Sequence, residues 1–347
     1  MTLPLPTRPL GASGLQITRV GFGAWATGGP WAFGWGPQDD HASMAAMRHA
    51  IGLGVNWIDT AAVYGLGHSE EVVGRVLRET SASERPLVFT KCGMVWEPGH
   101  PMAPARRDLR PESIRAECEA SLRRLGVERI DLYQFHWPDA SGVPVEDSWA
   151  AMLQLVDEGK VRLPGVCNFD VARLERCEAL RHVESLQPPF SLIRRGAAEA
   201  ELPWCAAHDT GVICYSPMQS GILTESFGAE RVARMAEDDW RRKSPEFNPP
   251  KLAANIALRD RLRPIARRHG ATVSAVAVAW TLAWPGVTGA IVGARSPEQV
   301  DGWIGAATLA LTEADLAEIA VALEETGAGK GPVSPVAGPA GAVASGG

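Results

Sequence analysis

The stretch VNWIDTAAVYG, residues 55–65, changes character half-way along its length. Residues 55–58 form a mainly apolar run of the kind that forms a buried strand, with Asn56 as its one polar side chain. Asp59 follows directly, and Tyr64 comes five residues later. A carboxylate and a phenol placed where a strand leaves the core make the end of this strand a candidate site.

Eight segments of the chain are short, apolar and rich in strand-forming residues, and nearly all of them are followed by a helical pattern. These strand candidates are residues 18–24, 55–58, 86–91, 129–136, 161–168, 183–187, 212–216 and 289–293. Continuous apolar strands that alternate with helices predict a parallel sheet covered on its outer face. Eight such units in one chain favour an α/β fold of the (β/α)8 TIM-barrel type over an open doubly wound sheet.

The remaining segments suggest how this barrel is completed. Residues 1–326 are expected to form a single barrel domain with long loops, in which segment 8–17 is an N-terminal β-hairpin that closes the bottom. The polar segment 226–255 is either a lid over a bound cofactor or a plain surface excursion. Residues 327–347 are mostly Gly, Ala, Pro and Ser, so a disordered tail is expected there.

Composition excludes several classes of function. The net charge of −6 argues against a nucleic-acid partner, which usually requires a basic surface. No apolar run is long enough to cross a bilayer, and the N-terminus lacks the features of a signal peptide. The six cysteines are scattered without a C-x-x-C pair, which predicts reduced core thiols in a cytoplasmic protein. A metal-dependent hydrolase built on Asp59 and His136 lacks a credible ligand set, so no metal is expected.

The ends of the predicted strands carry polar groups or a glycine. In chain order these residues are Asp59, Lys91, His136, Asn168, Gln187, Tyr215 with Ser216, and Gly293. In a barrel the carboxyl ends of all strands meet at one face, where active sites of this architecture lie. Each residue alone has an ordinary explanation as a cap or loop residue, but together they predict a shared site.

Tyr64 and three of the strand-end residues, Asp59, Lys91 and His136, fit one reaction, the protonation of a carbonyl oxygen. Tyr64 has an ordinary pKa of about 10, too high for an efficient acid at neutral pH, and the ammonium group of Lys91 is expected to lower it. A buried lysine needs a counter-charge, which Asp59 supplies. His136 can donate a hydrogen bond to the same carbonyl oxygen.

This set lacks a reductant, and the other strand ends suit a nicotinamide cofactor. The carboxamides of Asn168 and Gln187 suit the amide of a nicotinamide, and Tyr215 offers a flat ring for stacking. Segments 216–224 and 292–299 offer glycines, hydroxyls, backbone N–H groups and an arginine at helix starts. Such groups bind a pyrophosphate and a ribose phosphate.

In combination, these motifs resemble the aldo-keto reductase superfamily over about residues 18–322. The resemblance is carried by NWIDTAAVYGLGHSEEVVGRVL (56–77), TKCG (90–93), DLYQFHWPD (131–139), GVCNF (165–169), LQPPFSL (186–192), YSPMQSGILT (215–224) and VGARSPEQ (292–299). It implies a (β/α)8 barrel that reduces aldehydes and ketones with NADP(H), or in some members with NAD(H), and without a metal.

The resemblance also implies roles for individual residues. It makes Asp59, Tyr64, Lys91 and His136 the catalytic residues, with Tyr64 as the acid. Its implied cofactor contacts come from the second half of the barrel, namely Asn168, Gln187, Tyr215, Ser216, Met218, Gly221, Leu223, Gly293, Arg295 and Gln299. Trp25 and Trp137 lie in or near loops of the same face, as walls of an apolar substrate pocket or as plain packing.

Three positions depart from the family pattern. Cys167 stands where a serine is common, and a thiol is a weaker hydrogen-bond donor. Pro164 is expected to interrupt the same strand, because it lacks a backbone donor. Gly302 and Trp303 stand where an acidic residue and an asparagine often approach the adenine.

Two functions follow as hypotheses. The first is an NADP(H)-dependent oxidoreductase whose partner is a small-molecule carbonyl or alcohol substrate. The alternative is a nicotinamide-cofactor-binding regulatory subunit with little or no turnover, similar to one branch of the family. In both hypotheses the protein binds neither nucleic acid nor membrane, and the sequence leaves the oligomeric state open.

Overall fold

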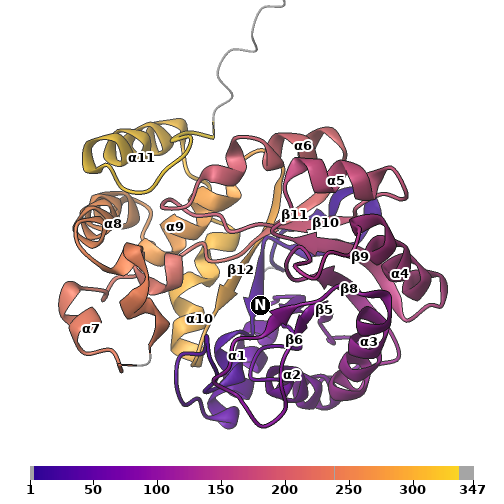
Figure 1. The fold of residues 1–347 in the computed structure, drawn as a ribbon. Helices are drawn as coiled ribbons and strands as arrows, with labels where there is room; N and C mark the ends of the chain where they lie inside the picture. Colours follow the sequence, from indigo (N-terminus) through magenta and orange to yellow (C-terminus); the bar gives the residue numbers. More distant parts are fainter. Residues whose placement is uncertain (1–3, 238, 336–347) are drawn as a thin grey trace, which may run out of the picture.

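Eight parallel strands close into a barrel at the centre of the computed structural model, which describes residues 4–237 and 239–335 (Figure 1). These strands are β3 (Val20–Gly23), β4 (Trp57–Asp59), β5 (Leu87–Cys92), β8 (Ile130–Phe135), β9 (Val161–Cys167), β10 (Ser185–Gln187), β11 (Gly211–Cys214) and β12 (Val287–Gly293). Around the barrel their order is β10-β11-β12-β3-β4-β5-β8-β9. Each observed strand overlaps a predicted one, so the predicted (β/α)8 barrel is confirmed.

Helices surround the strands on the outside of the barrel (Figure 1). They are α1 (Asp40–Gly52), α2 (His68–Glu79), α3 (Pro111–Leu125), α4 (Val145–Asp157), α5 (Val171–Glu178), α6 (Glu201–Ala207), α7 (Ala229–Ala233), α8 (Lys251–Arg268), α9 (Val273–Leu282), α10 (Pro297–Ile304) and α11 (Glu313–Thr326). Helix α11 was not predicted, although Thr312 and Asp315 form the capping box that marks its start.

The predicted N-terminal hairpin is present and closes one end of the barrel. Strands β1 (Thr7–Pro9) and β2 (Gln16–Thr18) pair in antiparallel fashion. Leu10 and Leu15 in the turn, and Ile17 in β2, are buried against the apolar side chains that point into the barrel. The lower interior is therefore a closed apolar core, and access to the interior is left to the opposite end.

One large side chain shows how tightly this lower interior is packed. Trp57 is fully buried, and its ring nitrogen donates to the carbonyl oxygen of Thr18 at 2.8 Å. A methyl group added at Gly21 would lie 2.1 Å from the ring, closer than van der Waals packing permits. The neighbouring strand β3 therefore needs a glycine at this position so that the indole can fit.

The prediction that Pro164 interrupts its strand is wrong. Strand β9 runs unbroken through this proline, and Tyr133 of β8 pairs with it in register.

The first residues after α11 pack against the barrel domain. Ala328 is buried, and the guanidinium of Arg195 donates to the carbonyl oxygens of Ala328 and Gly331, each at 3.1 Å. Disorder from residue 327 onward is thus contradicted at these positions, while residues 336–347 lie outside the described part.

Smaller elements extend the loops above the open end of the barrel. Strands β6 (Met94–Val95) and β7 (Arg106–Arg107) form a two-stranded antiparallel ribbon after β5. The long connection between β11 and α8 contains α7 and three short 3-10 helices, Gln219–Gly221, Trp240–Lys243 and Pro245–Phe247. Across the described ranges, no helix combines the length and apolar character needed to cross a membrane.

Candidate active site

The ammonium group of Lys91 contacts two other predicted catalytic residues, Asp59 and Tyr64, at the open end of the barrel. Its Nζ donates to Asp59 Oδ1 at 2.5 Å and to the carbonyl oxygen of Thr60 at 2.9 Å. The same nitrogen lies 3.3 Å from Tyr64 Oη, within hydrogen-bond distance. The Lys91 side chain is fully buried beneath the cavity described below. The structure thus brings a phenol, an ammonium and a carboxylate together, although 32 positions separate Asp59 from Lys91 in the chain.

His136 completes the predicted set directly after β8. Its ring centre lies 5.6 Å from that of Tyr64, and the two planes meet at 76°. Burial, and then the charge of Lys91, hold the pKa of His136 well below its ordinary value. The imidazole is therefore neutral at neutral pH, with one ring N–H able to donate a hydrogen bond.

The buried environment changes the acidity of the other three groups. Burial raises the pKa of Tyr64 above its ordinary value, and Lys91 opposes this rise by its charge and hydrogen bond. The prediction of a net lowering at Tyr64 is therefore wrong, although the contribution from Lys91 has the expected direction. Burial alone lowers the pKa of Lys91, but the charges of Asp59 and Tyr64 reverse this effect and raise it. Burial also raises the pKa of Asp59, against the opposing influence of Lys91.

Gln187 binds the second carboxylate oxygen of Asp59 and also contacts a second glutamine, Gln134. The side-chain nitrogen of Gln187 donates to Asp59 Oδ2 at 2.9 Å and lies 3.4 Å from Gln134 Oε1. The amide nitrogen of Gln187 is thus engaged with the carboxylate, a role that the sequence analysis did not assign to it. Gln134 was not predicted at the site, although it lies two residues before His136 and therefore on the same face of a strand.

Asn168 and Tyr215 hold each other beside His136. The side-chain nitrogen of Asn168 donates to the carbonyl oxygen of His136 at 2.9 Å, and Tyr215 Oη donates to Asn168 Oδ1 at 2.9 Å. Asn168 adopts a φ of 60°, which is uncommon for a residue other than glycine and tends to occur at functional sites. These contacts fix two of the side chains predicted to meet a nicotinamide.

A cavity of about 1230 Å³ lies above these groups. The predicted site residues that line it are Trp25, Asp59, Tyr64, His136, Trp137, Asn168, Gln187, Tyr215, Ser216, Met218, Gly221, Gly293, Arg295 and Gln299. Leu223 is an exception, because its side chain is fully buried in the hydrophobic core and has no access to the cavity. The volume is large enough for an extended cofactor together with a substrate.

The backbone along one wall of the cavity has an unusual conformation. Ser216, Gln219 and Ser220 have φ values of 57°, 46° and 51°, and Gly221 follows at 100°. Left-handed backbone is uncommon for residues other than glycine and tends to occur at functional sites. Within this turn the backbone N–H groups of Gln219 and Gly221 donate to the carbonyl oxygens of Ser216 and Met218, at 2.9 and 3.1 Å. The turn places Ser216 and Ser220 on the cavity wall. The expected contact of segment 216–224 with the pyrophosphate of a dinucleotide stays a prediction.

Three guanidinium groups line the cavity close to one another. Arg295 donates from Nε to Gln38 Oε1 at 2.5 Å, and its backbone N–H donates to Gln299 Oε1 at 2.9 Å. Arg231 and Arg241 also line the cavity, although neither was predicted there. Burial lowers the pKa of Arg231, and the charges of Arg241 and Arg295 add to the effect. Cations that are close enough to influence one another favour a phosphate-bearing ligand.

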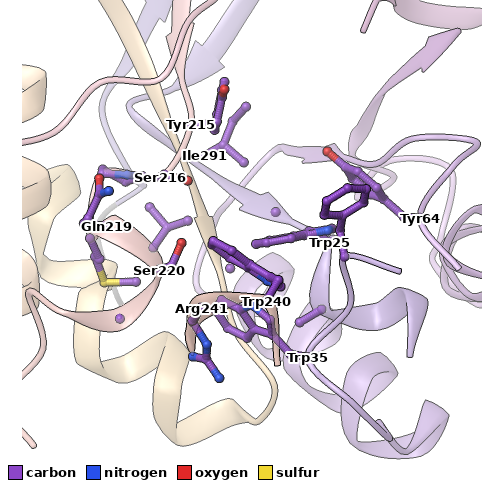
Figure 2. A pocket seen from close by; sticks show the side chains of 18 of the residues that line it. Trp25, Trp35, Tyr64, Tyr215, Ser216, Gln219, Ser220, Trp240, Arg241 and Ile291 are labelled. Carbon is purple, nitrogen blue, oxygen red and sulfur yellow. The ribbon is translucent and has the colours of Figure 1, made fainter. Parts of the chain in front are cut away.

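Tryptophans from two loops meet in the middle of the cavity, between Tyr64 and the wall that carries Ser216 and Ser220 (Figure 2). The ring centre of Trp25 lies 5.4 Å from that of Trp35 and 5.7 Å from that of Trp240. The guanidinium of Arg241 lies 4.7 Å from the ring centre of Trp35. Trp240 and Arg241 belong to segment 226–255, so this segment forms part of the cavity wall and is not a plain surface excursion.

The cysteines are buried thiols, and the acidic side chains of the described residues form no metal cluster. All six cysteines are buried and unpaired, and burial raises the pKa of Cys118, Cys177 and Cys205 to about 12. Such thiols are poor nucleophiles, because the thiolate is the reactive form. Within residues 4–237 and 239–335, no group of three or more His, Cys, Asp or Glu side chains is placed to hold a metal ion.

Comparison with known proteins identifies the family to which this site belongs. The model of the aldo/keto reductase family matches residues 19–324. The chain belongs to the aldo/keto reductase family. This aldo-keto reductase is 33% identical to "Aldo-keto reductase YhdN" of Bacillus subtilis, and the match covers 90% of this chain and 92% of that protein. It is 32% identical to "NADH-specific methylglyoxal reductase" of Escherichia coli, with 91% and 98% covered.

A solved structure agrees with the assignment. The glycerol dehydrogenase from Gluconobacter oxydans superimposes with a TM-score of 0.84 at 34% identity, over 96% of this chain and 98% of that one. The family match and these relatives make the protein an NAD(P)H-dependent oxidoreductase.

Proposed function

We propose that this aldo-keto reductase reduces a small-molecule aldehyde or ketone with NADP(H), and oxidises the matching alcohol, with Tyr64 as general acid and base. The observation that carries the proposal is the contact of Lys91 Nζ with both Asp59 Oδ1 and Tyr64 Oη, at 2.5 and 3.3 Å, beneath the cavity. Relatives named as a methylglyoxal reductase and a glycerol dehydrogenase support this class of reaction. We assign the activity to the cytoplasm, since six buried unpaired thiols suit a reducing compartment.

Each of the four residues has a distinct part in the proton transfer. Because burial raises its pKa, Tyr64 keeps its proton until negative charge develops on the substrate oxygen. The phenolate that then forms is stabilised by Lys91, which Asp59 keeps charged. The neutral imidazole of His136 donates an N–H to the substrate oxygen and orients it. A bound nicotinamide cofactor supplies the hydride to the carbonyl carbon.

The preference for NADP(H) over NAD(H) is supported by the charge at the cofactor end of the cavity. Arg231, Arg241 and Arg295 all line this end. Arg241 pairs with Asp239 at 2.6 Å, whereas no ion pair of Arg231 or Arg295 is found among the described residues. A 2′-phosphate brings negative charge that guanidinium groups bind well. Since one relative is named NADH-specific, the preference is a property to be tested for each member.

The test uses absorbance of the reduced nicotinamide with 4-nitrobenzaldehyde as substrate. Tyr64→Phe should lower kcat by about a thousandfold, because it removes the proton donor, while the Kd for NADPH stays near that of the wild type. The matched control is Tyr133→Phe, a buried tyrosine of β8 that packs in the core outside the barrel interior. The wild type should bind NADPH more tightly than NADH.

Two outcomes of this experiment would contradict the proposal in different ways. Wild-type turnover in Tyr64→Phe would exclude this residue as the acid. Tight NADPH binding with no turnover on a broad set of aldehydes and ketones would instead favour the regulatory cofactor-binding subunit.

A further inference from the structure

An arginine of the β6–β7 ribbon faces the substrate side of the cavity. Met94 lies directly opposite Arg107 in the ribbon, and Val95 lies opposite Arg106. Residues directly opposite in an antiparallel pair project from the same face. Met94 and Arg107 both line the cavity, so this face of the ribbon is turned toward the site. Arg106 belongs to the other face and donates to Asp108 Oδ2 at 2.5 Å.

The charge of Arg107 is not matched by an acidic group of the protein. Arg106 and Arg110 both pair with Asp108, at 2.5 and 2.6 Å. In contrast, Arg107 has no ion pair or side-chain hydrogen bond within the described part of the chain. Its guanidinium lies 4.5 Å from the ring centre of Trp137, a cation–π contact that holds it over the residue next to His136.

The cavity wall beside Tyr64 and Met94 is apolar and mostly aromatic. Trp31 lies 6.1 Å from Tyr64 and 5.9 Å from Phe33, measured between ring centres. Phe33 is 46% exposed, a large value for an aromatic side chain that lines a cavity. Flat apolar walls accommodate a flat apolar body, and a guanidinium matches the planar fork of a carboxylate.

We propose that Arg107 selects carbonyl substrates that carry a carboxylate on a flat apolar body, such as an aromatic aldehyde acid. The carbonyl group points to Tyr64 and His136, the body lies between Trp31, Phe33 and Trp137, and the carboxylate meets Arg107. The inference rests on the proposed carbonyl chemistry and adds the class of substrate to it. Arg107 binds the substrate and takes no part in the proton transfer.

The experiment compares three aldehydes of nearly the same shape, namely 4-formylbenzoate, its methyl ester and 4-nitrobenzaldehyde. The nitro group is planar like a carboxylate but carries no net charge, and the ester keeps the carbonyl substituent without the charge. The wild type should show a KM for 4-formylbenzoate about tenfold below that for the ester. Added salt should narrow this difference, since Arg107 is exposed.

Arg107→Met should abolish the preference by raising the KM for 4-formylbenzoate about tenfold, with kcat and the KM values of both neutral aldehydes nearly unchanged. Arg106→Met is the matched control. It removes the same charge at the neighbouring position, and the side chain of Arg106 does not line the cavity. This control should keep the wild-type preference.

Binding gives a second readout that does not depend on turnover. Quenching of tryptophan fluorescence, to which Trp31 and Trp137 contribute, reports the Kd of 4-formylbenzoate and of the ester. Equal affinity for the two compounds in the wild type, or the same preference in Arg107→Met, would overturn the role of Arg107. Absence of turnover with every aldehyde would count against the carbonyl reaction alone, while the ratio of the two Kd values would still decide on the role of Arg107.

Discussion

The lower and upper layers of the barrel interior come from the same strands but have opposite chemistry. The lower layer is apolar and contains Trp57, Phe89, Leu132, Leu163 and Ile213, sealed by the N-terminal hairpin. Two residues further along three of these strands, the side chains are Asp59, Lys91 and Gln134. Because side chains alternate between the two faces of a strand, an advance of two residues moves one layer up on the same face.

The difference between the layers separates stability from function. The lower layer removes large apolar side chains from water, which is the main favourable contribution to folding. The upper layer buries Asp59 and Lys91, whose loss of hydration offsets much of their attraction. A protein selected for stability alone would continue the apolar layer upward. We infer that the polar layer is kept for its chemistry and adds little to the free energy of unfolding.

The strongest test of this comparison is to break the charged pair from one side. Lys91→Met leaves Asp59 buried without a counter-charge, so the free energy of unfolding should fall by about 3–5 kcal/mol. The loss should be smaller in mild acid, where Asp59 can take up a proton. The rate of carbonyl reduction should fall by about a thousandfold, because Tyr64 loses the stabilisation of its phenolate. Denaturant unfolding and single-substrate kinetics measure the two effects.

The double variant Asp59→Asn with Lys91→Met is the control for this experiment. It removes both charges, so the free energy of unfolding should return to that of the wild type or exceed it. Turnover should remain as low as in the single variant. If the double variant stayed as unstable as Lys91→Met, the charged pair would be a net stabilising feature and the division between the layers would fail.

The lower layer should respond in the opposite way. Trp57→Ala should cost about 3–5 kcal/mol of unfolding free energy through the cavity it leaves, while turnover per folded molecule falls far less than in Lys91→Met. Gly21→Ala should cost about 1–3 kcal/mol, because its methyl group meets the indole. In the Trp57→Ala background this second cost should largely disappear. Additive losses would show that Gly21 is needed for some other reason.

Much of the fold and of the site could be predicted because both follow from the same short-range rule. A buried parallel strand is an apolar run, and the first polar residue after it lies at the open end of the barrel. This rule led to Asp59, Lys91 and His136 without any information on distance. The same rule, counted back by two residues from His136, would also have indicated Gln134.

The parts that were not predicted depend on contacts between distant loops. Arg231 and Trp240 lie in a long connection whose path depends on what its side chains meet, and no local pattern shows that they line the cavity. The net pKa of Tyr64 was predicted in the wrong direction, because the sequence showed the lysine but not the extent of burial. The roles of individual residues toward a cofactor remain predictions, with Gln187 engaged by Asp59 in the structure.

The smallest expected effect concerns the neutral imidazole at the top of the polar layer. Burial and the charge of Lys91 lower the pKa of His136 in the folded protein, whereas in the unfolded chain it is about 6.5. As the pH falls below this value, the unfolded chain binds a proton that the folded protein does not, so the free energy of unfolding decreases. His136→Gln should remove this contribution, which is at most about 1.4 kcal/mol per pH unit.

Denaturant unfolding of the wild type and of His136→Gln at several pH values below neutral measures the difference, and His41→Gln, at an exposed position of α1, is the matched control. Because the other histidines are common to the wild type and His136→Gln, their contributions cancel in the comparison. Parallel pH profiles for these two proteins would mean that the imidazole of His136 is as well solvated as in the unfolded chain. In that case the upper layer would be open to water, and its contrast with the sealed lower layer would be one of side-chain type and not of burial.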